Sequence, residues 1–179
     1  MNKKQFLTSM IVILLMAVVV MGVAWLLHGP GTDRYIQEKK DTIHFMLTDS
    51  DSFTEELDNG GNEAIEKVYK GQSGYVIEVV TQGYAGPVRT MVGVDNSGSV
   101  QGITVRDMQE TLGLGTQALT DYEFLMQFLL TRGDAEVGEN VDAMTGATVT
   151  SKAIARAVNI AVGYVTGADT SSGATSWGG

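Results

Sequence analysis

The sequence predicts an N-terminal transmembrane helix followed by one α+β domain. Residues 6–27 form an apolar run of 22 residues without a charge. Residues 75–106 contain three β-type segments separated by short turns, and residues 153–165 carry an apolar stripe at helical spacing. Because these turns are too short to hold crossover helices, the strands are expected to pair as an antiparallel meander with packed helices rather than as a doubly wound parallel sheet.

Composition excludes several classes of function. The chain of 179 residues has no cysteine, which rules out disulfides, thiolate catalysis and cysteine-ligated clusters, and only 2 histidines, so we expect no metal site. It has 21 acidic and 12 basic residues. Lys3 and Lys4 precede the apolar run, so the chain beyond it has a formal charge of −11. Such a surface repels nucleic acid, and we expect no nucleic-acid partner.

The apolar run is long enough to cross a bilayer. A helix of this length spans about 33 Å at 1.5 Å per residue. Lys3 and Lys4 favour a cytoplasmic N-terminus, residues 1–5, and a domain on the extracytoplasmic face of the cell membrane. A cleaved signal peptide is the alternative, but the run is long for one and no Ala-x-Ala site follows. We therefore expect residues 6–27 to be an uncleaved single-pass anchor.

Residues 28–62 are expected to lead from the membrane to the domain. Gly29-Pro30-Gly31 predicts a break after the anchor, residues 33–47 a short second helix, and the acidic residues 48–62 a solvated loop. The domain itself is expected to occupy residues 63–166.

Within the domain, the period-2 segments predict strands at residues 75–81, 88–94 and 100–106. Residues 122–130 are apolar almost all round and predict a buried helix rather than a cofactor-binding segment. Residues 134–140 read as a polar connector. A Ser-, Thr- and Gly-rich tail, residues 167–179, is expected to be disordered.

The most informative stretch runs from Asp142 to Thr148 and opens the last predicted helix. Thr148, Thr150 and Ser151 are the residue types that cap a helix start through their side-chain oxygens. A helix N-terminus after a glycine also suits a phosphate, but the dipole contributes only about 0.3–1 kcal/mol, so tight retention needs a covalent bond or many other contacts. From the residues alone, a capped helix after a tight turn is the simpler interpretation, and the P-loop pattern is absent.

The string Asp142-x-x-Thr145-Gly146-Ala147-Thr148 resembles the flavinylation motif of the FMN-binding domain found in the RnfG and NqrC components of the Rnf and Nqr electron-transfer complexes. The resemblance implies that Thr148 carries FMN through a phosphoester bond. It also implies an external flavin transferase that uses FAD and Mg²⁺, with Asp142 positioning the loop or the metal of that enzyme.

The tail contains a second match to this pattern, Asp169-x-x-Ser172-Gly173-Ala174-Thr175. Thr175 is therefore an alternative or additional acceptor. We favour Thr148, because an amphipathic helix follows it, whereas only four residues follow Thr175.

A second loop resembles the Glu-Thr-Pro-Gly-Leu-Gly motif of the same family. The matching residues are Glu110, Thr111, Gly113, Leu114 and Gly115, while Leu112 stands where proline is usual and Met108 where many members have histidine. By resemblance these residues contact the flavin, with Glu110 and Thr111 tuning its potential and Leu114 packing on the ring. The stretch Gly83-Tyr84-x-Gly86 resembles the turn of the family.

The resemblance implies a covalently flavinylated electron-carrier subunit of a membrane-bound, Rnf-type ferredoxin:NAD oxidoreductase that exports Na⁺ or H⁺. Its partners would be the other membrane subunits and the flavin transferase, and it would be a redox subunit without catalytic residues of its own rather than a stand-alone enzyme. An NqrC-like protein, of a type that is usually longer, and a stand-alone extracytoplasmic flavoprotein are alternatives. The non-redox alternative is a membrane-tethered binding or scaffold module, in which the Thr-Gly loops are only caps and turns.

Overall fold

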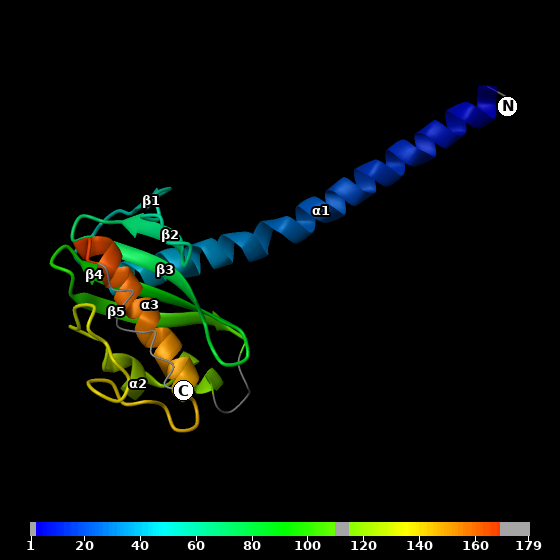
Figure 1. Ribbon diagram of the computed structural model, residues 1–179. Coiled ribbons are helices and arrows are strands. Elements are labelled where there is room, and N and C mark those ends of the chain that lie inside the picture. The colour runs from blue at the N-terminus through cyan, green and yellow to red at the C-terminus, as the bar shows by residue number, and fades with distance from the viewer. Residues whose placement is uncertain (1–2, 110–114, 169–179) are drawn as a thin grey trace. The chain divides into compact units, whose positions relative to one another are not determined.

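The computed structural model describes residues 3–109 and 115–168 and divides the chain into two units, Met1–Thr42 and Ile43–Gly179. Helix α1 (Lys3–Met46) forms the first unit, and its last residues belong to the second (Figure 1). No helix contains, among the residues with described side chains, a stretch long and apolar enough to cross a membrane.

The predicted break at Gly29-Pro30-Gly31 is wrong, because α1 continues through it. The predicted second helix, residues 33–47, is the C-terminal part of the same helix. A proline removes one helical hydrogen bond but leaves the residues on either side free to stay helical. Helix-forming flanks therefore carry α1 across this site.

The second unit is built on one antiparallel sheet of 5 strands in the order β1-β2-β3-β4-β5. The strands are β1 (Thr54–Glu56), β2 (Ile65–Lys70), β3 (Gly74–Gln82), β4 (Pro87–Asp95) and β5 (Val100–Met108). The predicted α+β class and antiparallel meander are confirmed, with β3, β4 and β5 at the three predicted positions.

Two strands escaped prediction. Strand β1 lies inside the predicted acidic loop, and β2 lies in a stretch for which no strand was expected. The alternation of β2 is interrupted by a register shift between Ile65 and Lys67. Strand β1 has no apolar pattern; its carboxylates pair across to β2, Glu55 with Lys67 at 3.4 Å and Glu56 with Lys70 at 3.3 Å.

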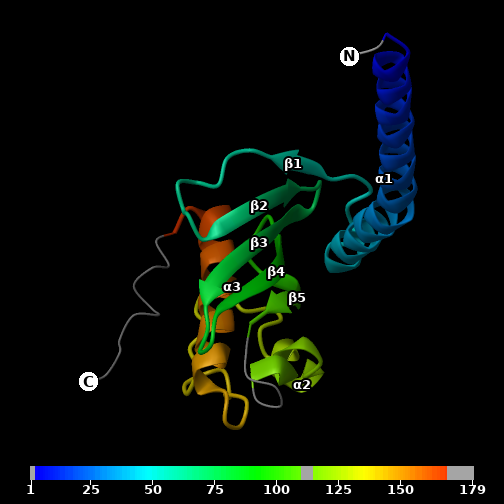
Figure 2. The same cartoon turned by 90° about the vertical axis from the view of Figure 1, so that its right-hand side faces the viewer.

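Helix α3 (Thr148–Thr166) covers one face of the sheet and forms the main core with it (Figure 2). Fully buried members of this core include Ile77, Val79, Val92, Ile154 and Val158. The predicted amphipathic helix at residues 153–165 is confirmed, and the sheet-facing side is the predicted apolar stripe.

The end of α1 packs on the opposite face, in a second cluster that contains Ile43, Met46 and Met91. Two glycines paired across β4 and β5, Gly93 and Gly102, make room for Met46. A Cβ at Gly93 would lie 2.9 Å from the Met46 Cβ, and one at Gly102 would lie 3.1 Å from the Met46 Cα. The close approach therefore depends on the absence of both side chains.

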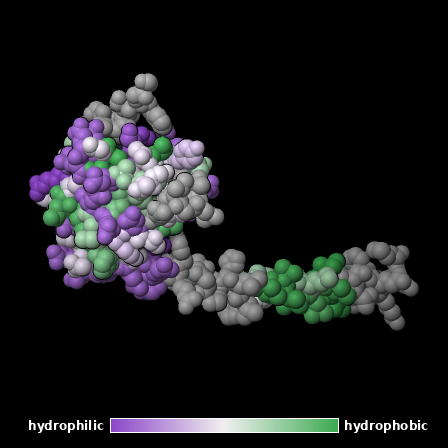
Figure 3. Space-filling model, turned by 90° about the horizontal axis from the view of Figure 1, so that it is seen from below, coloured by the Kyte–Doolittle hydropathy of each residue, from purple (hydrophilic) through white to green (hydrophobic). Residues whose placement is uncertain are grey.

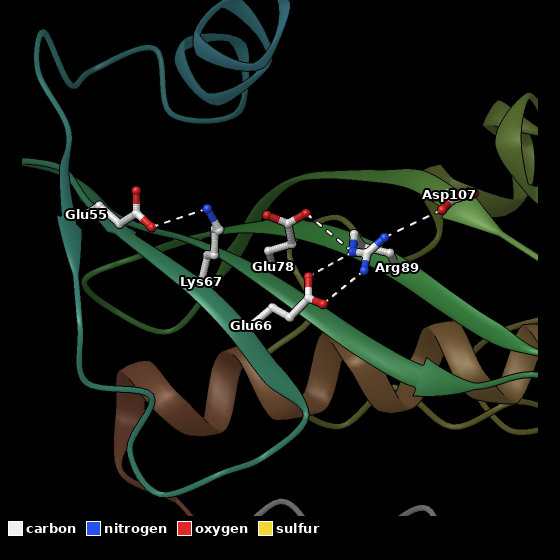
Figure 4. Close-up of polar contacts among 6 residues, drawn as sticks. All are labelled: Glu55, Glu66, Lys67, Glu78, Arg89 and Asp107. Atoms are coloured by element: carbon white, nitrogen blue, oxygen red, sulfur yellow. Dashed lines mark hydrogen bonds and ion pairs between the residues drawn. The ribbon is translucent and has the colours of Figure 1, made fainter. Parts of the chain in front are cut away.

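Four strands are joined on this face by one guanidinium group (Figure 4). The Arg89 Nε and Nη2 donate to the two oxygens of Glu66 at 2.8 and 2.9 Å. The buried Glu78 lies 3.6 Å from Nε, and Asp107 lies 3.5 Å from Nη1. The hydrogen bonds to Glu66 are the main reason that the pKa of Arg89 is raised.

The predicted buried helix at residues 122–130 is wrong in length and in burial. Helix α2 covers only Tyr122–Met126, with Phe124 and Leu125 buried. The chain then turns away, because the Leu130 N–H donates to the Val100 carbonyl at 2.8 Å instead of continuing the helix. Tyr122 and Met126 are 73% and 64% exposed.

Candidate functional site

The segment between Asp142 and Thr148 forms a tight turn at the start of α3. The Ala147 N–H donates to the Met144 carbonyl at 3.0 Å, which closes the turn. Gly146, the third residue of this turn, has φ 75°. A side chain is strained at such an angle, so the turn explains why a glycine stands here.

This turn is fastened to the core from its inner side. Met144 and Ala147 are buried, with 4% and 6% exposure. The Ser151 hydroxyl accepts a hydrogen bond from the Met144 N–H and donates one to the Ala147 carbonyl, both at 3.0 Å. The Ser151 hydroxyl, in the first turn of α3, thus links Met144 and Ala147, the two ends of the tight turn.

The predicted side-chain capping by Thr148, Thr150 and Ser151 is wrong. Helix α3 begins at Thr148, and its N-cap residue, Ala147, makes no side-chain cap hydrogen bond. A capping side chain must precede the first helical turn. Because the helix starts five residues earlier than its apolar stripe, all three residues lie within that first turn.

Gln127, just after α2, holds the other end of the motif. Its Oε1 accepts from the Asp142 N–H at 2.7 Å, and its Nε2 donates to the Asp142 carbonyl at 3.4 Å. The backbone of Asp142 is therefore fixed by a side chain 15 residues away in sequence.

The outer side of the motif is open to solvent. Asp142, Thr145, Gly146 and Thr148 are all exposed. Thr148 is the first helical residue, and the first helical hydrogen bond is donated by the Ser151 N–H to the Ala147 carbonyl at 2.9 Å. The N–H groups that precede this bond and the helix dipole favour an anion at this end. An exposed hydroxyl with small neighbours at such a place fits a phosphate ester.

The second predicted loop directly follows β5 in the chain. Glu110, Thr111, Gly113 and Leu114 lie outside the described residues, as does Thr175, while Gly115 is buried and begins the 3-10 helix η1 (Gly115–Leu119). This helix follows β5 and packs against both β5 and α3 (Figure 1).

Two contacts place the β3–β4 hairpin near Gln109, at the end of β5, and near the N-terminal part of α3. A Cβ at Gly86 would lie 2.8 Å from the Cβ of Gln109, the last described residue before the loop. The Thr81 hydroxyl donates to the Ala153 carbonyl, in the N-terminal part of α3, at 2.9 Å. The predicted turn, the base of the predicted loop and the predicted acceptor therefore gather at one end of the domain (Figure 2).

Gln127 is a supporting residue of the candidate site that sequence reasoning missed. It is the one polar residue between Phe124 and Leu130, which is a usable signal: an amide in an otherwise apolar run often has a specific backbone partner. Ser151 was singled out, but for a different role.

Comparison with known proteins identifies relatives of this chain. The FMN-binding domain family matches residues 83–163. The chain is 30% identical over 156 residues to the G subunit of the proton-translocating ferredoxin:NAD(+) oxidoreductase complex of Clostridium ljungdahlii, covering 83% of each chain. It is 32% identical over 144 residues to the G subunit of the ion-translocating oxidoreductase complex of Methanosarcina acetivorans, covering 72% of this chain and 76% of the relative.

Among solved structures, NqrC of Shewanella oneidensis superposes with a TM-score of 0.46 at 18% identity, over 67% of this chain and 69% of that one. The assignment to a family rests on the sequence relatives alone. The chain belongs to the RnfG family of ion-translocating oxidoreductase subunits and contains an FMN-binding domain.

Proposed function

We propose that this chain carries FMN covalently on Thr148 and relays electrons as a subunit of a membrane-bound, Rnf-type ion-translocating ferredoxin:NAD oxidoreductase complex. One observation carries the proposal: the motif is fixed from the inside by Ser151 and Gln127, while the Thr148 residue stands exposed at the helix start. An acceptor for an external enzyme has to combine these two properties, a defined backbone and an accessible hydroxyl.

The attachment step transfers the FMN half of FAD. The Thr148 Oγ1 forms a new bond to the phosphorus that bears the riboflavin group, the P–O bond within the pyrophosphate breaks, and AMP leaves. The hydroxyl proton passes to a base of the flavin transferase, whose Mg²⁺ stabilises the charge on the phosphates. We propose that Asp142 orients this enzyme or its metal, and the support is that Asp142 is exposed at the start of the motif.

FMN held on Thr148 would supply redox chemistry that couples one-electron to two-electron carriers. We propose that Glu110, Thr111, Gly113, Leu114 and Gly115 contact the ring. Thr145, Gly146 and Ala147 complete the motif that surrounds the phosphate. The support for this set is that Gly115 and the base of the loop lie at the same end of the domain as Thr148.

We further propose that residues 6–27 anchor the chain in the cell membrane, with residues 1–5 in the cytoplasm and the flavin domain outside. The large apolar side chains described between Met10 and Val23 are at least 50% exposed and form a continuous apolar surface on α1 (Figure 3). Protease added to intact spheroplasts should digest the domain, and the mature chain should keep its N-terminus. A soluble mature chain that begins beyond residue 28 would overturn this topology.

The central experiment is intact-mass analysis and peptide mapping of the membrane-expressed chain. Wild type, Thr148→Val, Thr148→Ser and Thr175→Val are compared. One FMN that is lost in Thr148→Val and kept in Thr175→Val supports the proposal, and retention in Thr148→Ser would show that the hydroxyl is what matters. A flavin lost only in Thr175→Val would overturn the assignment.

The same preparations separate the other functions. Flavin fluorescence that survives denaturing electrophoresis excludes a non-redox tethering module. Co-purification of the neighbouring subunits decides between an Rnf-type complex, an Nqr-type complex and a stand-alone flavoprotein.

A further inference from the structure

An open apolar groove lies between the end of α1, strand β5 and helix α2. Its volume is about 620 Å³. The apolar side chains that line it and remain exposed are Phe45, Leu119, Tyr122, Met126 and Leu129. We call this feature the Tyr122 groove.

Helix α2, which carries two of the exposed apolar side chains of the groove, is anchored to the core of the domain. Phe124 and Phe128 are buried and meet edge to face with ring centroids 5.2 Å apart. The Asp121 carboxylate caps α2 by accepting from the Phe124 N–H at 3.0 Å. Tyr122 and Met126 therefore project from an anchored element, and their exposure, 73% and 64%, belongs to a defined surface. Clustered exposed apolar groups of this kind mark binding surfaces.

The charges in the groove are of one sign. Asp49 and Asp95 line it, and none of the described residues that line it is lysine, arginine or histidine. Although burial opposes the ionisation of Asp95, hydrogen bonds from Ser97, Ser99 and Gln101 outweigh it and lower the pKa of this carboxyl. An acidic edge beside an apolar centre is complementary to apolar side chains flanked by lysine or arginine.

One side of the groove is linked through the chain to the proposed flavin attachment motif. Met126 is followed directly by Gln127, whose side chain holds the Asp142 backbone. A partner seated on the groove would thus contact the element that supports the proposed acceptor loop.

We propose that the Tyr122 groove is the docking site for another subunit of the same complex, which inserts apolar side chains flanked by lysine or arginine. This rests on the proposed membership of an Rnf-type complex. Charge argues against two other occupants. Anionic lipid headgroups would be repelled, and a symmetric contact with a second copy would bring two acidic edges together.

The test uses the full chain, tagged and expressed within its complex. Met126→Glu and Tyr122→Glu place a carboxylate in the groove, and Leu57→Glu is the matched control because Leu57 is fully exposed and does not line the groove. We expect the two groove variants to lower the recovery of the other subunits by about tenfold or more, as central interface residues do. Leu57→Glu should leave recovery unchanged.

Covalent flavin content is measured on the same samples. Unchanged flavin with lost subunits supports docking at the groove. Normal recovery of the subunits with the groove variants overturns it, and so does an equal loss with Leu57→Glu. Absence of flavin from every form, with the subunits recovered by the wild-type chain and lost by the groove variants, would count against the attachment proposal and leave the docking result intact.

A photo-crosslinking residue at position 126 identifies the occupant. The expected product is a crosslink to a segment of another subunit that contains apolar residues next to lysine or arginine. Crosslinks confined to lipid, to a second copy of this chain or to its own flavin would overturn the proposal.

Discussion

The buried side chain of Asn159 makes both amide hydrogen bonds to the backbone of Ala135. Its Oδ1 accepts from the Ala135 N–H and its Nδ2 donates to the Ala135 carbonyl, both at 3.0 Å. Ala135 is itself buried, with 4% exposure. The connector that leads to the flavin motif is therefore fixed to the middle of α3 by a single side chain.

Replacing Asn159 by alanine should destabilise the domain by about 2–4 kcal/mol, because two buried backbone groups lose their partners. Asn96→Ala is the matched control. Its Nδ2 donates to the Gln72 carbonyl at 3.1 Å at an exposed site, so a loss below about 1 kcal/mol is expected. Urea denaturation measures both, and equal losses would contradict the structural role of Asn159.

Gln127→Ala should loosen the motif without unfolding the domain. The Asp142 N–H loses its acceptor, so its hydrogen exchange should become faster, and the free energy of unfolding should fall by about 0.5–1.5 kcal/mol. If the motif must be ordered for the transferase, flavin attachment should also slow. Gln101→Ala removes an exposed amide that bonds to Asp95 at 2.7 Å, outside the motif, and should change neither the exchange of the Asp142 N–H nor flavin attachment.

Gly146→Ala should reduce flavin attachment, because its φ of 75° is strained for any side chain. Gly138 offers a control with the same backbone requirement, since its φ is 97° and a Cβ there would meet nothing within 4 Å. Both variants should lose about 1 kcal/mol of stability, but only Gly146→Ala should lower the covalent flavin content. Equal flavin contents in the two variants would show that recognition by the transferase does not depend on the geometry of this turn.

Protonation of Asp95 should make the free energy of unfolding fall at acidic pH. Its pKa is lowered in the folded state, so its contribution is present above the ordinary aspartate pKa of about 3.9 and is lost as the pH falls through the folded value. Asp95→Asn should therefore flatten the decline in the free energy of unfolding below about pH 4. Denaturation curves from pH 7 to pH 3 for both proteins test this, and parallel curves would contradict it.

The sheet could be predicted where the side-chain pattern alone carries the information. Strands β3 to β5 are rich in β-branched residues and are separated by turn residues, so their positions follow from the sequence, although β3 and β4 bury consecutive residues rather than alternate ones. Strand β1 has no such pattern. It forms an antiparallel ladder with β2, and its glutamates form ion pairs with Lys67 and Lys70, relations that exist only after β2 has been placed.

The candidate site also has a part that could be predicted from the sequence and a part that could not. Thr148 could be singled out because the motif is contiguous in sequence and resembles a known family. Its support could not be predicted, since Gln127 reaches Asp142 across 15 residues through the fold. The mistaken burial of residues 122–130 has a related cause. An apolar segment is buried all round only if the fold offers it a neighbour on every side, and in α2 Tyr122 and Met126 remain exposed.

The hydrogen bonds from Ser151 and Gln127 to the motif bear on whether the domain folds before or after flavin attachment. Every group that closes this turn belongs to the chain itself, so the acceptor loop needs no flavin to take its shape. On the proposed attachment to Thr148, loading would be a step on an already folded domain, and it could take place after the chain has reached the membrane. Cells short of flavin would hold a folded, colourless stock of this protein that can be charged as soon as the supply returns.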